Sequence, residues 1–289
     1  MGSGRAMTRR WIGRVLPMLS LAAAVGAHAQ EAVTIRTYAA QEARQGVASD
    51  GAYFYAIDNN RIGKYRIATG ERVQQWEGDP ESFPHINSCT VAEEELVCAS
   101  SNYPALPQKS SVEFFSLNPV AHLRSVSLAG APGSLTVMNR HDGHWWAVFA
   151  NYDKRGSEPG QDHRQTYLVR YDDDFHALAQ WTFPADVLAR FAPSSCSGAS
   201  WTTSGLLLAS GHDRPEIYAL KLPKRGTVLE HVATLPVASH GQAIDMDPKW
   251  SDLLWSIDRP TSTVVASRVD ITGQAPGTDS VTSGRADRP

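Results

Sequence analysis

Residues 46–60 read GVASDGAYFYAIDNN, and this stretch decides the fold. A short strand of small residues leads to a turn at Asp50-Gly51, and a strand of large apolar residues follows. The chain then becomes abruptly polar at residues 58–60. Because an Asp-Gly pair between two strand-like runs is a strong hairpin signal, the segment predicts two antiparallel strands, the second of which ends in a polar cluster.

The same pattern occurs five times along the chain. The copies begin at residues 46, 88, 134, 198 and 242. A third strand-like run follows every copy, and a fourth follows all but the last, after which the chain is rich in Gly, Ser, Thr and Pro. Repeats of roughly 40 to 50 residues are typical of propeller blades.

One strand-like run, VTIRTYAA at residues 33–40, belongs to none of the five copies. In a closed propeller such a strand completes the last blade and leaves no exposed sheet edge. The sequence therefore predicts an all-β fold, a five-bladed β-propeller closed by the N-terminal strand in the last blade. A six- or seven-bladed ring is the alternative, and six blades would split a recognisable repeat.

The ends of the chain differ from its middle. Arg9, Arg10 and Arg14 precede the apolar run 15–27, which ends in an A-x-A site at residues 27–29. This pattern predicts a signal peptide over 1–29, with the export route left open, and a periplasmic or secreted protein. A single propeller domain is expected over 30–272 and a disordered tail over 273–289. The mature chain has no apolar stretch of membrane-spanning length, so no membrane span is expected.

Charge excludes one class of partner. The 289 residues carry 30 acidic and 27 basic side chains, a net charge of -3, and the basic residues are scattered. A nucleic-acid-binding protein needs a basic footprint, so nucleic acid is not an expected partner.

Three cysteines are present in a chain expected to be exported. If Glu93-Glu94 is a two-residue hairpin turn, Cys89 faces Cys98 at a non-hydrogen-bonded position, where side chains come closest. The spacing predicts a disulfide between them in an oxidising compartment. Cys196 is left over and is interpreted as a small buried residue.

The polar ends of the repeats fall into two sets. Alignment at the second-strand ends gives Asn59, Asn102, Asn151, His212 and Arg259. Alignment at the inner-strand starts gives Gln45, Asn87, Gly133, Ser197 and Gln242, with His85 and His240 two residues before two members. In a propeller both positions lie on one face beside the central channel, so these side chains are expected to line a polar funnel. The HDGH segment at 141–144 falls on the opposite face.

These residue types suggest the chemistry of the funnel. His85, His212 and His240 are the acid/base candidates, because imidazole moves protons near neutral pH. Arg259 is expected to hold a carboxylate. Ligand-positioning residues would be Gln45, Asn59, Asn87, Asn102, Asn151, Ser197 and Gln242. The three histidines with a carboxylate would also suit a divalent metal such as Zn²⁺, so the cofactor stays open.

Two other enzyme classes fit less well. A glycosidase needs paired carboxylates on the inner strands, where this chain has amides and histidines. A serine hydrolase built on Ser197 lacks the G-x-S-x-G elbow. Two long loops, after Asn102 and after Asp153, follow second strands; an ordered partial lid over the funnel and floppy loops are the two alternatives, and Pro104, Pro107 and Pro159 favour the lid.

Several stretches resemble a known family. HINSCTV, SNYPALP, SSVEFFS, GSLTVMNRHDGHWWAVFANYD and SGHDRPEIYALKLP are similar to secreted β-propeller proteins that sometimes carry the label cycloisomerase. The resemblance covers about Gln45 to Asp270 and implies a propeller. Cys89 and Cys196 depart from the family pattern. A more distant likeness, through Gln45-Gly46, is to five-bladed glutaminyl-cyclase propellers.

The functional prediction is an exported propeller that binds a small polar or anionic molecule in its central funnel. Acid/base chemistry of the cycloisomerase or lyase type would be its enzymatic form. The alternative is a non-enzymatic binding or protein-interaction propeller, since propellers serve both roles. The sequence leaves the ligand and the oligomeric state open.

Overall fold

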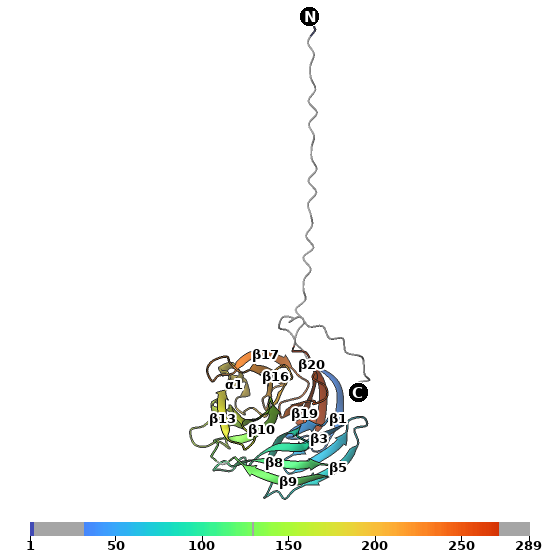
Figure 1. Ribbon diagram of the computed structural model, residues 1–289, viewed down its shortest axis with the longest axis vertical. Helices are drawn as coiled ribbons and strands as arrows, with labels where there is room; N and C mark the ends of the chain where they lie inside the picture. Colours follow the sequence, from blue (N-terminus) through green and yellow to red (C-terminus); the bar gives the residue numbers. More distant parts are fainter. Residues whose placement is uncertain (3–31, 129, 272–289) are drawn as a thin grey trace.

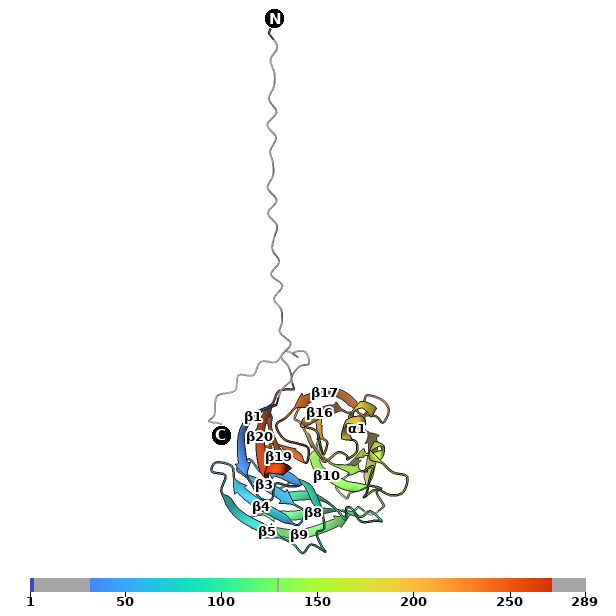
Figure 2. The ribbon, with the colours of Figure 1, turned by 180° about the vertical axis from the view of Figure 1, so that it is seen from behind.

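The computed structural model describes residues 1–2, 32–128 and 130–271. Within them, five four-stranded antiparallel sheets surround a common axis and form a disc (Figures 1 and 2). This confirms the predicted five-bladed β-propeller. The predicted tail at 273–289 lies outside the described residues, as does the predicted signal peptide apart from residues 1–2.

The blades are numbered in chain order, and each runs from the axis outward. The first contains β2 (Gly46–Ser49), β3 (Tyr53–Asp58), β4 (Arg61–Arg66) and β5 (Arg72–Glu77). The second contains β6 (Ile86–Ala92), β7 (Glu95–Ser101), β8 (Ser110–Leu117) and β9 (Val120–Ser127). The third contains β10 (Ser134–His141), β11 (His144–Ala150), β12 (Tyr167–Tyr171) and β13 (Ala177–Thr182).

The fourth blade contains β14 (Gly198–Trp201), β15 (Leu207–Ser210), β16 (Glu216–Lys221) and β17 (Glu230–Pro236). The fifth contains β18 (Ile244–Met246), β19 (Leu253–Asp258), β20 (Thr263–Val269) and, outermost, β1 (Ala32–Ala39). Antiparallel pairing of Ala32 with Val269 and of Ala39 with Thr263 closes the ring. The predicted closure by the N-terminal strand is therefore confirmed.

Three short helical segments interrupt the strand pattern: η1 (His163–Gln165), α1 (Ala185–Phe191) and η2 (Arg259–Thr261). The repeat pattern did not predict α1, which links the third and fourth blades. Its Val187, Leu188 and Phe191 lie on one face and are buried in the core between these blades. No helix of the described residues is long and apolar enough to cross a membrane.

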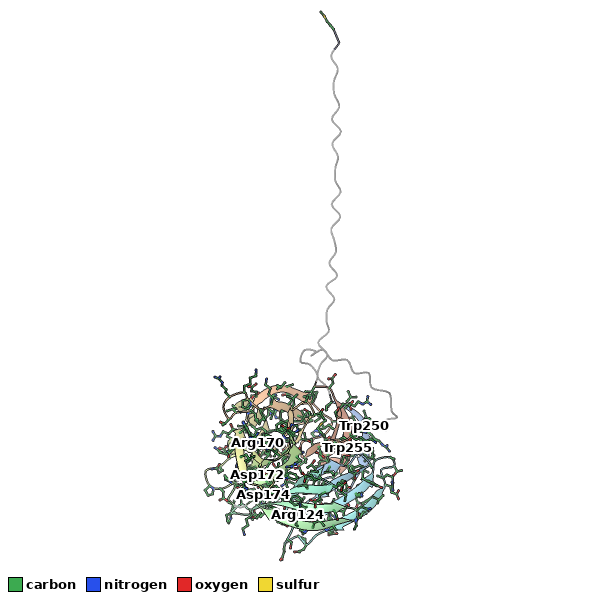
Figure 3. All side chains as sticks on the ribbon, viewed as in Figure 1. Arg124, Arg170, Asp172, Asp174, Trp250 and Trp255 are labelled. Carbon is green, nitrogen blue, oxygen red and sulfur yellow. A yellow bond between two sulfur atoms is a disulfide. The ribbon has the colours of Figure 1, made fainter. Side chains whose placement is uncertain are left out.

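Aromatic side chains fill the space between neighbouring blades. Trp255 of the fifth blade (Figure 3) packs against Phe54 of the first, with ring centroids 5.6 Å apart. Tyr38 from β1 contacts both rings. The closing strand is therefore held by interblade packing as well as by its hydrogen bonds to β20.

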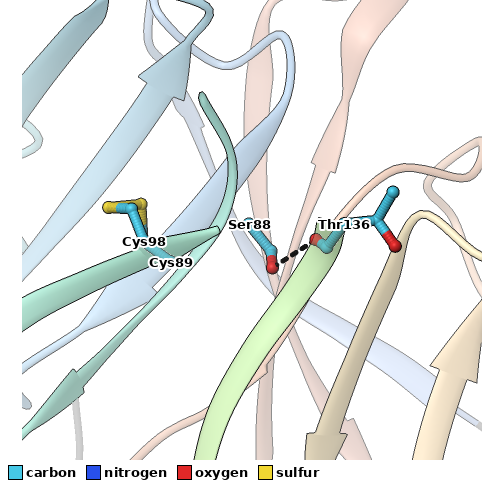
Figure 4. Close-up of a disulfide and its surroundings, with 4 residues drawn as sticks. All are labelled: Ser88, Cys89, Cys98 and Thr136. Carbon is cyan, nitrogen blue, oxygen red and sulfur yellow. Dashed lines mark hydrogen bonds between the residues drawn. A yellow bond between two sulfur atoms is a disulfide. The ribbon is translucent and has the colours of Figure 1, made fainter. Parts of the chain in front are cut away.

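The β6–β7 hairpin has the predicted register. Cys89 faces Cys98 across a turn at Glu93-Glu94. The two cysteines form a disulfide with Cα atoms 4.0 Å apart (Figure 4), which confirms the predicted bond. Beside it, Ser88 donates its hydroxyl to the carbonyl of Thr136 in the third blade, at 2.7 Å (Figure 4). The disulfide therefore lies in a strand that also ties two blades together.

The innermost strands meet on the axis in a buried set of polar residues, one from each blade, here called the belt. Its members are Ser49, Thr90, Asn139, Ser200 and Asp245. The Asp245 carboxylate accepts hydrogen bonds from Thr90 at 3.2 Å and from Ser200 at 3.1 Å, and Asn139 donates to Ser200 at 3.3 Å. Because Thr90 and Asp245 come from blades that are not neighbours, their contact spans the channel.

Candidate functional site

A central cavity of about 460 Å³ opens on one face of the disc, above the belt. Every blade contributes a polar residue to it at or just before its innermost strand: Gln45, Asn87, Thr136, Ser197 and Gln242. These five residues are here called the funnel ring. Asn59, His85, His212 and Arg259 line the same cavity. Eight of the eleven sequence-predicted site residues are thus brought together.

His85 is held at the cavity wall by a short chain of side chains. Its Nδ1 lies 2.7 Å from the Asn59 side-chain oxygen, and that oxygen also accepts a hydrogen bond from Gln45 at 2.9 Å. The His85 ring also contacts Tyr103, with centroids 5.4 Å apart. The pKa of His85 is lowered to about 4, mainly by burial and next by the charge of Arg259, against the opposing effects of Asp58 and of a hydrogen bond with Asn87. At neutral pH His85 is therefore uncharged.

The cavity is electropositive. None of the described residues that line it is Asp or Glu, whereas Arg155 and Arg259 are both among them. Arg259 is partly buried and makes no ion pair or side-chain hydrogen bond within the described part of the chain. A guanidinium in such a position loses hydration without gaining a counter-ion.

A side cavity of about 670 Å³ adjoins the central one and shares His212, Gln242 and Arg259 with it. His240 lines this side cavity and not the central one. Its Nδ1 lies 3.2 Å from an Asp258 carboxylate oxygen, and His212 Nδ1 lies 2.7 Å from Asp213. The two carboxylates of the side cavity are therefore both occupied by histidines.

The backbone before β18 sets the positions of His212 and Gln242. Gly241 has a φ of 59°, and a Cβ atom there would lie 2.0 Å from the carbonyl oxygen of His212. Only glycine permits this approach. The next residue, Gln242, also has a positive φ, 69°, and its N–H donates to Gly211. The end of β15 and the start of β18 are thereby packed together at the cavity wall.

Asn102 and Asn151 do not line the central cavity. Asn102 bonds within its own loop, donating to Pro107 at 2.9 Å and accepting from the Lys109 N–H at 2.8 Å. Asn151 is buried and donates to the Gln165 carbonyl at 3.1 Å. In both blades the next residue, Tyr103 or Tyr152, lines the cavity instead. The Asn-Tyr pair that occurs in both blades is the sequence signal that could have identified these tyrosines.

Thr136 was also missed, because Gly133 was assigned to its position. A register shift in the β10–β11 pair, between Leu135 and Val137, adds a residue to the strand. Thr136 lies three residues after Gly133, at this register shift.

The two long loops contact each other. Gln108 of the first loop donates its backbone N–H to Glu158 of the second, at 2.8 Å, and its side-chain amide donates to Gly156. Tyr103 packs against Tyr152 with centroids 4.8 Å apart. Both loops contribute to the cavity lining, through Pro104 and Arg155. They form one wall of the funnel, and the partial lid stays a prediction.

The predicted histidines do not form a metal-ligand cluster in the described part of the chain. There, only Asp153, Asp162 and His163 have three such ligand atoms within 4.8 Å of one another. Arg164 already occupies the Asp162 carboxylate, and His163 bonds to Asp153 at 2.5 Å. Cys196 is free and fully buried, and burial raises the pKa of its thiol to about 12.

The fold and the cavity define this chain as a five-bladed β-propeller with a polar, electropositive funnel. No protein-family model matches the sequence, and no curated protein matches it. Similar solved structures include the crystal structure of the RRP9 WD40 repeats and the structure of U3-55K. Each is 10% identical to this chain, has a TM-score of 0.42, and covers 78% of this chain and 67% of its own.

Proposed function

We propose that this protein binds a small anionic molecule in its central funnel. The observation that carries the proposal is Arg259, a partly buried arginine that lines the cavity without a carboxylate partner in the described chain. Arg155 lines the same cavity, so an anion there would meet two guanidinium groups. Each planar guanidinium can hold a carboxylate through two parallel hydrogen bonds.

The neutral residues of the funnel support a small polar ligand. Gln45, Asn87, Ser197 and Gln242 offer amide and hydroxyl groups at the cavity floor, and Tyr103 offers an aromatic wall. A volume of about 460 Å³ accommodates a small organic acid. Ligand sites of this type place a few polar groups at fixed points of a concave surface.

Calorimetric titration with two probes of equal shape tests the proposal. L-lactate carries a carboxylate, and lactamide replaces it with a neutral amide. We expect lactate to bind and lactamide to bind at least tenfold more weakly, since charge-assisted hydrogen bonds are about twice as strong as neutral ones. Arg259→Gln should remove the difference. Arg36→Gln, an equal charge change on the outermost strand β1, should preserve it. Equal binding of both probes, or of neither, would refute the proposal.

Acid/base chemistry of the cycloisomerase or lyase type is the enzymatic form of the same proposal. Its support is that His85 and His212 line one cavity and that His85 is unprotonated at neutral pH. His85 would accept a proton from the bound anion, and His212 beside Asp213 would return one. His85→Gln should then retain anion binding and abolish turnover. If His85→Gln instead abolishes anion binding, His85 acts in ligand recognition and not in proton transfer.

A further inference from the structure

Three neighbouring side chains, Gln45, Asn59 and His85, form the most ordered polar group in the funnel. The Asn59 side-chain oxygen receives two contacts, from Gln45 Nε2 and from His85 Nδ1. Gln45 is buried, and Asn59 and His85 are partly buried. An amide oxygen is only an acceptor, so a short contact to it from a ring nitrogen requires a proton on that nitrogen.

We infer that Gln45 and Asn59 are positioning residues that hold His85 as its neutral Nδ1–H tautomer, with Nε2 left as a hydrogen-bond acceptor for the ligand. The inference rests on the proposed anion site and narrows its ligand to a carboxylate that also carries a hydroxyl or amine hydrogen. Gln45 and Asn59 then influence the ligand through His85.

His85 Nε2 and the two arginines of the cavity require different groups on a ligand. The guanidinium groups of Arg155 and Arg259 only donate hydrogen bonds, so they pair with an acceptor such as a carboxylate, whereas Nε2 pairs with a donor. A ligand with a carboxylate alone would satisfy the arginines and leave the His85 acceptor unpaired. A hydroxyl beside the carboxylate would satisfy both.

The charges around His85 agree with a neutral ring. The charge of Arg259 disfavours the imidazolium, whereas the charge of Asp58 and a hydrogen bond with the Asn87 side chain favour it. Tyr103 covers one side of the ring and contributes burial. Burial is the largest of these effects and favours the neutral form.

NMR of the full chain with labelled histidine tests the tautomer, with His85→Gln used to assign the signal. We expect His85 to be the Nδ1–H tautomer at pH 7 and to charge only near pH 4. Asn59→Asp places a carboxylate against Nδ1 and should raise the pKa of His85 strongly. Asn102→Asp, the same change at the corresponding strand end of the next blade, should leave it unchanged. An Nε2–H tautomer, or an Asn59→Asp variant with unchanged titration, would overturn the inference.

Binding of L-lactate and propionate tests the ligand class, because the two acids differ only by the hydroxyl beside the carboxylate. We expect lactate to bind about tenfold more tightly, the effect of one hydrogen bond, and His85→Phe to abolish the preference. If both bind equally and depend on Arg259, the acceptor role is refuted and the anion site stands. If neither binds, the proposed function itself is contradicted. The tautomer is read from the unliganded protein in either case.

Discussion

The funnel ring and the belt come from the same five innermost strands, only three or four residues apart. Belt residues bond to one another: Asp245 is contacted from two other blades, and Ser200 links Asn139 to it. Funnel-ring residues face a cavity instead, beside an arginine with no counter-ion in the described chain. Polar residues of the innermost strands therefore differ in what they contact: those of the belt hold the blades together, and those of the funnel ring line an open cavity.

The largest expected effect concerns the belt residue Asp245. Burial raises the pKa of its carboxyl to about 8, although Ser200 and Thr90 donate hydrogen bonds to it. The folded protein thus keeps a proton that the unfolded chain releases near pH 4, so the free energy of unfolding should fall as pH rises from about 4 to 8. We expect a loss on the order of several kcal/mol.

Urea unfolding at a series of pH values measures this loss. Asp245→Asn has no proton to release and should lack this component of the pH dependence. If the free energy of unfolding changes with pH in the same way for the wild type and the variant, Asp245 does not titrate in this range.

The second effect concerns the disulfide in β6, the strand that supplies Asn87 to the funnel ring and Thr90 to the belt. The Cys89–Cys98 bond closes a short loop, with a sequence separation of nine residues. Reduction and refolding should lower the free energy of unfolding by about 2 to 3 kcal/mol on the chain-entropy estimate. Cys89→Ala with Cys98→Ala should show no further change with reductant. If the free energy of unfolding of the refolded wild type is the same with and without reductant, the disulfide makes no such contribution to stability.

A matched pair of serines in the fourth blade gives a smaller effect. Ser200 donates to Asp245 and accepts from the Met246 N–H at 3.0 Å, so Ser200→Ala should cost about 1 to 3 kcal/mol. Ser197 is partly exposed, and its hydroxyl makes no hydrogen bond among the described residues. Ser197→Ala should therefore change stability by no more than about 0.5 kcal/mol. Chemical denaturation compares them, and equal losses would erase the distinction between belt and funnel ring.

The smallest effect is electrostatic. Since Arg259 lowers the pKa of His85, Arg259→Gln should raise it, with burial still keeping it below its usual range. Histidine NMR titration measures the change. A fall in the pKa of His85 would contradict the placement of the arginine beside this ring.

The fold was predictable because it depends on patterns that repeat. The hairpin register of Cys89 and Cys98 and the closure by β1 both follow from counting along strands. The site was predictable where the alignment of the repeats holds, as for Arg259, and not in the third blade, where the cavity is lined by Thr136, three residues after the aligned Gly133. The belt could not be anticipated, because no sequence pattern tells a hydroxyl that bonds across the axis from one that faces water. Helix α1 was missed because it lies between repeats.

Closure by β1 also sets the order in which the blades can be completed. The strand Ala32–Ala39 is synthesised before the other nineteen described strands, yet its partner, Thr263–Val269, is synthesised last. On the ribosome, which releases a chain from its N-terminus, β1 must wait unpaired while the first four blades fold as contiguous units. The fifth blade, which carries Gln242 and Arg259, is completed only after β20 has been synthesised. The funnel, which needs residues of all five blades, is therefore complete only when β1 has paired with β20.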